Sequence, residues 1–106
     1  MAFFGKLFDR AKKPDIKTLK KARDLDALFE AATHADWYTR YEATLALGEM
    51  GDESVLPNLI ARLDDEHKEV RNAAARALNR VGGTRAVRVL AERGLLIEKA
   101  RGTHIA

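Results

Sequence analysis

The chain has 106 residues, of which 46% are hydrophobic and 33% charged, and it contains no cysteine. This length and composition indicate one small globular domain, and they exclude a fibrous chain, a wholly disordered chain and a large multidomain enzyme. The formal net charge of +3 combines three unequal blocks, because residues 1–24 carry +5, residues 25–70 carry −8 and residues 71–106 carry +6. We therefore expect two basic ends and an acidic middle, which would attract different partners to different places.

An apolar and basic segment opens the chain, and we expect residues 1–13 to form a helical cap. Its bulky apolar residues form pairs four apart, as on one face of a helix: Phe3, Phe4, Leu7 and Phe8. The segment is too short and interrupted for a signal peptide, and no run in the sequence approaches the ~18 apolar residues of a membrane-spanning helix. We expect a cytoplasmic protein. The Lys and Arg residues between Lys6 and Arg23 either surround a solvated helix or lie on an anionic membrane.

A degenerate repeat follows over residues 14–33, and Pro14 separates it from the cap. We expect a short first helix over residues 15–23. A short apolar stripe predicts the second helix, and its members are Leu25, Leu28 and Phe29.

Two longer units occupy residues 34–64 and 65–94, and they are near copies with a period of 31 residues. Of 28 residue pairs compared in this register, seven are identical. The shared apolar positions follow one stripe of a helix. Each stripe stops at a glycine, Gly51 or Gly82, which can take the left-handed conformation that ends a helix. A period of this length indicates stacked repeats.

A shorter second helix is expected in each unit. It begins near Ser54 in one and near Thr84 in the other, because both side chains can cap N–H groups. Pro57 falls in the first turn, where a missing donor costs little. An acidic turn, residues 64–66, leads into the next unit, and residues 95–106 form a C-terminal cap and tail.

The strings DWYTRYEATLALGEMGD and KEVRNAAARALNRVGG resemble HEAT repeats of the short type first associated with phycobilin lyases, the PBS lyase HEAT-like type. The resemblance covers roughly residues 15–93. It implies an all-α fold, a short alpha-alpha superhelix of about two and a half helix pairs whose second helices line a concave face. It also implies a structural role for Arg40 and Arg71, at the recurrent arginine position, through contact with an acidic turn such as Asp64 or Asp65.

Catalysis has little support in the sequence. His34 and His67 lie in equivalent turns one repeat apart, too far from each other to share a metal ion. No phosphate loop, HExxH or GxSxG motif occurs in the sequence. Bilin lyase-like activity is a distant third interpretation, because the shared repeat is a scaffold and a fold does not transfer function. We expect no enzyme activity, no cofactor and no metal.

Binding of a partner protein is the favoured function, through a positive rim on the second helices. The candidate residues are Asn58, Arg62, Arg85, Arg88 and Arg93. Arginine suits this task because its planar guanidinium binds oxyanions with two parallel hydrogen bonds. The alternatives are a solvated face, or a nucleic-acid-associated or membrane-proximal adaptor that uses the basic ends. The acidic middle argues against nucleic acid because it would repel phosphates.

An apolar patch on the first long helix is a second candidate surface, formed by Trp37, Tyr41 and Leu45. The equivalent positions one repeat later are polar, and they are Lys68, Asn72 and Arg76. Either the N-terminal Phe cluster folds over this patch, or the patch is open to a partner helix, a second copy of the chain or a membrane surface.

Overall fold

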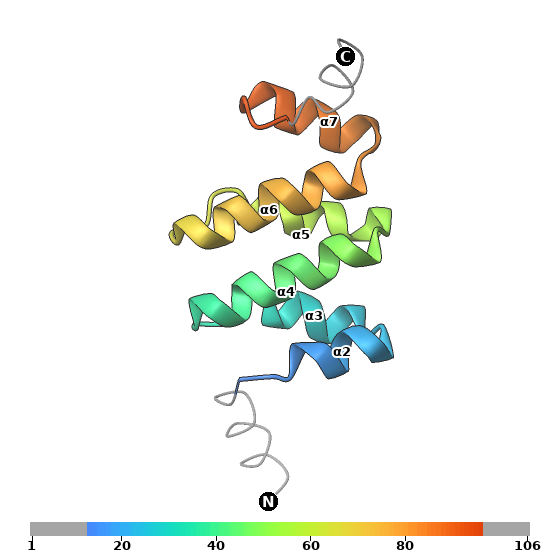
Figure 1. Cartoon of the computed structure of the whole chain (residues 1–106), viewed down its shortest axis with the longest axis vertical. Helices are drawn as coiled ribbons and strands as arrows, with labels where there is room; N and C mark the ends of the chain where they lie inside the picture. Colours follow the sequence, from blue (N-terminus) through green and yellow to red (C-terminus); the bar gives the residue numbers. More distant parts are fainter. Residues whose placement is uncertain (1–12, 97–106) are drawn as a thin grey trace, which may run out of the picture.

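The computed structural model describes residues 13–96, which form six α-helices in three successive pairs. The pairs are α2 (Ile16–Ala22) with α3 (Leu25–Ala31), α4 (Trp37–Met50) with α5 (Leu56–Arg62), and α6 (Lys68–Val81) with α7 (Gly83–Glu92). Figure 1 shows them as a single stack that rises from α2 to α7. The all-α fold is confirmed. The first pair is short but complete, so the described residues hold three pairs where we expected two and a half.

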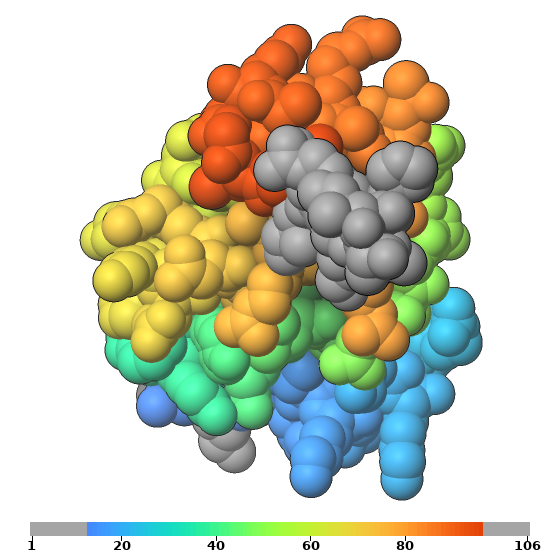
Figure 2. Space-filling model, turned by 45° about the horizontal axis from the view of Figure 1, so that its top comes forward, coloured from blue at the N-terminus to red at the C-terminus, as the bar shows by residue number. Residues whose placement is uncertain are grey.

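Packing between the second and third units runs mainly through their first helices, with α4 lying along α6, whereas α4 packs on both α2 and α3 of the first unit. In the space-filling view the units follow one another in direct contact (Figure 2). The predicted cap helix, apart from Lys13, and the tail beyond Leu96 lie outside the described residues.

The two long helices begin at side-chain caps of different chemistry. The Asp36 carboxylate caps α4 by accepting hydrogen bonds from the amide and the hydroxyl of Thr39, both at 2.9 Å. At the equivalent position of α6, Nδ1 of His67 accepts a hydrogen bond from the Glu69 amide at 3.2 Å. A carboxylate and an imidazole nitrogen thus perform the same task in the two repeats, because either can accept a hydrogen bond from an otherwise unsatisfied amide.

The glycines that end these helices differ in conformation. Gly51 has φ 67° and ψ 9°, the left-handed conformation that we expected. Gly82 has φ 70° and ψ −157°, so the left-handed prediction is wrong for this residue. Its conformation is one that glycine alone adopts readily. The chain therefore leaves Gly82 in a different direction, and α7 begins at the next residue.

The second helix of the middle unit also starts differently from the prediction. Ser54 does not cap it, and α5 has no side-chain cap; instead the Asp52 carboxylate accepts a hydrogen bond from the Ser54 amide at 3.0 Å. A 3-10 turn, Glu53–Val55, follows Asp52 and leads into α5. Pro57 lies in the first turn of α5, as expected, where no hydrogen-bond donor is required.

A ladder of aliphatic side chains forms the core. The largest of the completely buried apolar residues are Leu28, Leu47, Val55, Leu56, Leu59, Val70, Leu78 and Leu90. Small residues bring α4 and α6 together. A Cβ atom placed on Gly48 would lie 2.6 Å from the Cβ of Ala77, far inside van der Waals contact. Gly48 therefore sets how closely the two long helices approach.

Truncation of the ladder tests the register of the repeat. Leu47→Ala and Leu78→Ala should each lower the free energy of unfolding by about 2 to 5 kcal/mol, because each removes a completely buried side chain and leaves a cavity. Urea melts followed by circular dichroism measure the loss. Leu95→Ala is the control, since Leu95 is 40% exposed and its truncation should change stability little. Equal losses in all three variants would contradict the proposed register.

Gly48→Ala should destabilise the protein even though alanine is the better helix former by about 1 kcal/mol. The added methyl would overlap the Ala77 Cβ, which is attached directly to the α6 backbone and cannot turn away. We expect a net loss of about 1 to 3 kcal/mol in the same melts. Adding Ala77→Gly should restore part of the loss by reopening the space. Simple addition of the two single losses in the double variant would show that these residues do not limit the helix spacing.

Candidate functional site

Arg40 joins the turns that precede the two long helices. Its side chain is only 10% exposed, and its Nε and Nη2 donate to Oδ2 and Oδ1 of Asp65 at 2.8 and 3.0 Å. Its Nη1 donates to the carbonyls of His34 and Ala35 at 2.8 and 3.0 Å. A single guanidinium therefore ties the turn before α4 to the turn before α6. We call this arrangement of Arg40 and Asp65 the clamp.

Further contacts converge on the Asp65 carboxylate. Its Oδ1 accepts the His67 amide at 2.9 Å, and its Oδ2 lies 3.4 Å from Nη1 of Arg62, which also donates to the Ala32 carbonyl at 3.0 Å. Burial raises the pKa of Asp65. The hydrogen bonds from Arg40 and His67 and the charges of Arg40 and Arg62 outweigh this effect and hold the pKa below its ordinary value. Asp65 is thus a mostly buried carboxylate that stays ionised between two arginines.

Arg71 repeats only the backbone part of the Arg40 pattern. Its Nη1 donates to the carbonyls of Asp65 and Glu66 at 2.8 and 3.1 Å, just as Arg40 binds the carbonyls of its own turn. One repeat after Asp65 the sequence has Leu96, which offers no carboxylate. Arg71 remains exposed, and within residues 13–96 the complete clamp occurs once.

The turns before α4 and α6 use histidine and aspartate in exchanged places. In the first turn, Nδ1 of His34 accepts the Asp36 amide at 3.0 Å. In the second turn, Oδ1 of Asp65 accepts the His67 amide at 2.9 Å. The exchange puts the carboxylate where Arg40 can reach it. We expected Arg40 to contact an acidic turn such as Asp64 or Asp65, and it binds Asp65. The exchange of histidine and aspartate was not predicted, although the reversed order of the two residue types in the sequence was the available signal.

The candidate residues on the second helices have different environments. Arg93 donates to Asp64 at 2.7 and 3.3 Å, and Arg62 is engaged with Asp65. Asn58 is half-buried on α5. The two remaining residues lie on α7, and they are Arg85 and Arg88. Both are exposed, and among the described residues neither has an acidic partner.

Two residues of the apolar patch, Trp37 and Tyr41, belong to a cluster of four rings. The Trp37 indole stacks on the His67 imidazole with ring centres 3.8 Å apart and planes 6° apart. Tyr38 and Tyr41 meet the indole edge-on at 5.5 and 6.3 Å. Trp37 is 37% exposed and Tyr38 is 49% exposed. We call these four residues the aromatic cluster. The residues that would cover it in one of the two alternatives, Phe3, Phe4, Leu7 and Phe8, lie outside the described residues.

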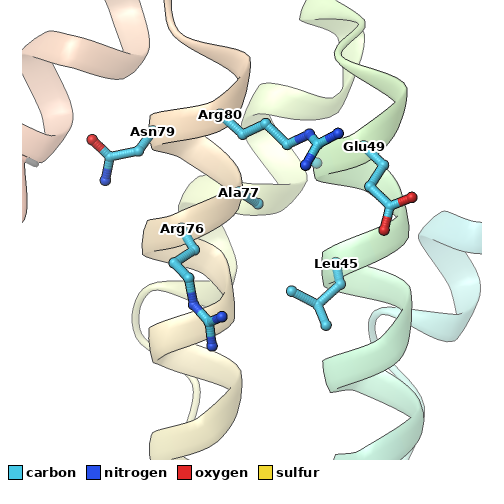
Figure 3. Close-up of a pocket in the computed structure, with 7 residues that line it drawn as sticks. Leu45, Glu49, Arg76, Ala77, Asn79 and Arg80 are labelled. Carbon is cyan, nitrogen blue, oxygen red and sulfur yellow. The ribbon is translucent and has the colours of Figure 1, made fainter. Parts of the chain in front are cut away.

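A groove of about 500 Å³ lies between α4 and α6 (Figure 3). Gly48 and Ala77, which lie close to each other, form its floor. Leu45 and Glu49 belong to the α4 wall, and Arg76 and Arg80 belong to the α6 wall. Because Leu45 follows Tyr41 by one helical turn, the apolar patch runs from the aromatic cluster into this groove.

Two further properties concern residues 13–96 alone. None of the helices in this range has the length and apolar character needed to cross a bilayer. Nowhere in the same range do three His, Asp or Glu side chains gather as ligands for a metal ion.

Asp65→Asn should destabilise the fold strongly, because Arg40 would be left buried without its counter-ion. We expect a loss of about 3 kcal/mol, the order found when one partner of a buried ion pair is removed. Denaturant melts at pH 7 measure it. Asp64→Asn, at the adjacent exposed carboxylate, is the matched control and should have a clearly smaller effect. Similar losses in both variants would contradict a special role for the clamp.

The effect of Asp65→Asn should also depend on pH. The pKa of Asp65 lies lower in the folded chain than its ordinary value of 3.8, so its charge stabilises the fold fully above that value. The contribution is lost as the pH falls through the lowered pKa. The difference in stability between wild type and variant should therefore be constant from about pH 7 to about pH 5 and shrink below about pH 4. If the stability difference between wild type and Asp65→Asn stayed the same below about pH 4, the charge of Asp65 would not be what stabilises the fold.

Comparison with known proteins agrees with this architecture. The family model for HEAT repeats matches residues 25–96, more than half of the chain, over the helices from α3 to α7. None of the curated proteins compared with the chain matches it. HEAT repeats generally bind partner proteins or act as scaffolds, and the family is generally noncatalytic. The match and the stack of helix pairs show that this chain belongs to the HEAT repeat family.

Proposed function

We propose that the chain is a noncatalytic module that binds an acidic segment of a partner protein on the exposed face of α7. The observation that carries the proposal is the difference among the arginines of the second helices. Arg62 and Arg93 are bound to carboxylates of this chain, whereas Arg85 and Arg88 are exposed and lack an acidic partner among residues 13–96. Being three residues apart, these two guanidinium groups share one side of the helix.

The rest of the stack supports this role by holding α7 in place before any partner arrives. Ala86 and Leu90 are completely buried and anchor the opposite side of the helix. The ion pair between Arg93 and Asp64 joins its C-terminal end to the turn between α5 and α6. Because α7 is already ordered, little conformational entropy is lost on binding, and the two arginines can each hold a carboxylate through parallel hydrogen bonds.

The charge distribution favours an acidic protein over nucleic acid. Residues 25–70, which form most of the two units below α7, carry a net charge of −8. A phosphate backbone that continued along the stack from Arg85 and Arg88 would meet this negative region. A protein segment can place a few carboxylates against α7 and present uncharged residues elsewhere.

Charge reversal at α7 tests the proposal. Arg85→Glu combined with Arg88→Glu should reduce retention of acidic partner proteins roughly tenfold or more, because like charges would then face each other. The measurement is affinity purification from the native organism with quantitative mass spectrometry. The control variant, Lys17→Glu with Lys21→Glu, makes the same change in net charge at exposed lysines of α2. Unchanged retention by the α7 variant, or an equal loss with the control, would refute binding at this face.

A further inference from the structure

We propose that the groove between α4 and α6, together with the aromatic cluster, is a second docking surface that binds an acidic peptide segment with bulky apolar side chains. This surface is formed by the first helices of the two units, whereas the function proposed above uses α7. Either proposal can therefore fail without the other. Three features of this surface fit such a peptide, namely the fixed geometry of the rings, the shape of the groove and the unpaired positive charge of its α6 wall.

The aromatic cluster is held in position by the units that carry it. Trp37 is the first residue of α4 and His67 is the cap of α6, so the ring stack spans two units. The cap hydrogen bond to Glu69 and the bond from the His67 amide to Asp65 fix the imidazole beneath the indole. A partly exposed ring that is already fixed can bind an apolar side chain with little loss of conformational entropy. Trp, Tyr and Arg are also the residues that contribute most often to binding energy at interfaces.

The groove provides depth beside this cluster. Gly48 has no side chain and Ala77 only a methyl group, so the floor is low while the walls carry long side chains. Trp37, Tyr41 and Leu45 follow one another by four residues along the α4 side. The 14 residues of α4 make a helix about 21 Å long. A bound helical peptide about 21 Å long could therefore reach from the rings to the far end of the groove.

The charge of the groove identifies the occupant. Arg76 and Arg80 stand one helical turn apart on the α6 wall, both are exposed, and neither forms an ion pair within residues 13–96. In Figure 3 the guanidinium of Arg80 reaches toward α4. The acidic residue of the groove, Glu49, is already paired with Lys20 at 2.8 Å. The two arginines therefore offer bidentate sites for carboxylates spaced about one turn apart on a ligand.

Nucleic acid fits this surface less well. The α4 side carries Glu42 and Glu49, which would repel a continuous phosphate backbone. One face of the Trp37 indole is occupied by His67, so it is closed to base stacking. An acidic peptide can direct its carboxylates to the α6 wall and its apolar side chains to the α4 side.

The first experiment uses a phage-displayed library of random 16-residue peptides selected on the full chain. Enriched peptides should combine at least two carboxylates with bulky apolar residues. Their synthetic versions are then titrated into the nitrogen-15-labelled protein. The chain has a single tryptophan, so its indole N–H signal reports directly on the aromatic cluster. We expect this signal and the Gly48 amide signal to shift on binding. No such enrichment, or enriched peptides that leave the indole signal unmoved, would overturn the proposal.

The second experiment tests whether Arg76 and Arg80 bind the carboxylates of the peptide. Arg76→Glu with Arg80→Glu should weaken binding of the selected peptides roughly tenfold or more. Conversely, a peptide whose acidic residues are replaced by lysine should bind this variant more tightly than it binds the wild-type protein. Lys17→Glu with Lys21→Glu is the matched control, because it makes the same charge change at exposed lysines of α2 and should leave the affinity unchanged. An equal loss in both variants would overturn the assignment to the groove. Displacement of the peptide by a 12-nucleotide single-stranded DNA at equal affinity would assign the surface to nucleic acid instead.

Discussion

The buried ion pair between Arg40 and Asp65 fixes how the middle unit sits against the unit that follows. Removing two charges from water is costly, and the cost is offset only when the charges are paired and their remaining hydrogen-bonding groups are satisfied. Arg40 meets this condition with two carboxylate contacts and two backbone carbonyls. The position of His67 follows from the same carboxylate, because Asp65 also holds its amide. Asp65 thus joins the clamp to the residue whose ring stacks on Trp37.

The sequence predicted the stack well because its determinants lie within single units. The 31-residue period, the apolar stripes and the stop at Gly51 are local signals, and the structure follows them. The short helix expected over residues 15–23 spans Ile16–Ala22. The conformation of Gly82 differs from the left-handed one that we expected. The sequence indicates that a glycine ends the helix, but several conformations are open to glycine, and the sequence does not indicate which of them leads the chain into α7.

The surfaces were harder to predict because they depend on contacts between units. Arg62, Arg85 and Arg93 looked alike as exposed positive charges on second helices. Arg62 and Arg93 lie within reach of acidic residues in the turn between α5 and α6, and this depends on the path of that turn. Likewise, the stripe through Trp37 was visible in the sequence, but His67 joins it from the next repeat. A periodic pattern identifies equivalent positions, and packing between units decides what each one contacts.

The clamp also makes the stack mechanically uneven. Repeat units touch only their neighbours, so stiffness is a property of each junction. The junction between the second and third units has the buried ion pair and the tight contact of Gly48 with Ala77. The junction below it has the exposed ion pair of Lys20 with Glu49 and the hydrogen bond from Arg62 to the Ala32 carbonyl, but no buried ion pair among the described residues. A load along the stack would therefore bend the molecule between the first and second units and leave the groove and the aromatic cluster undistorted.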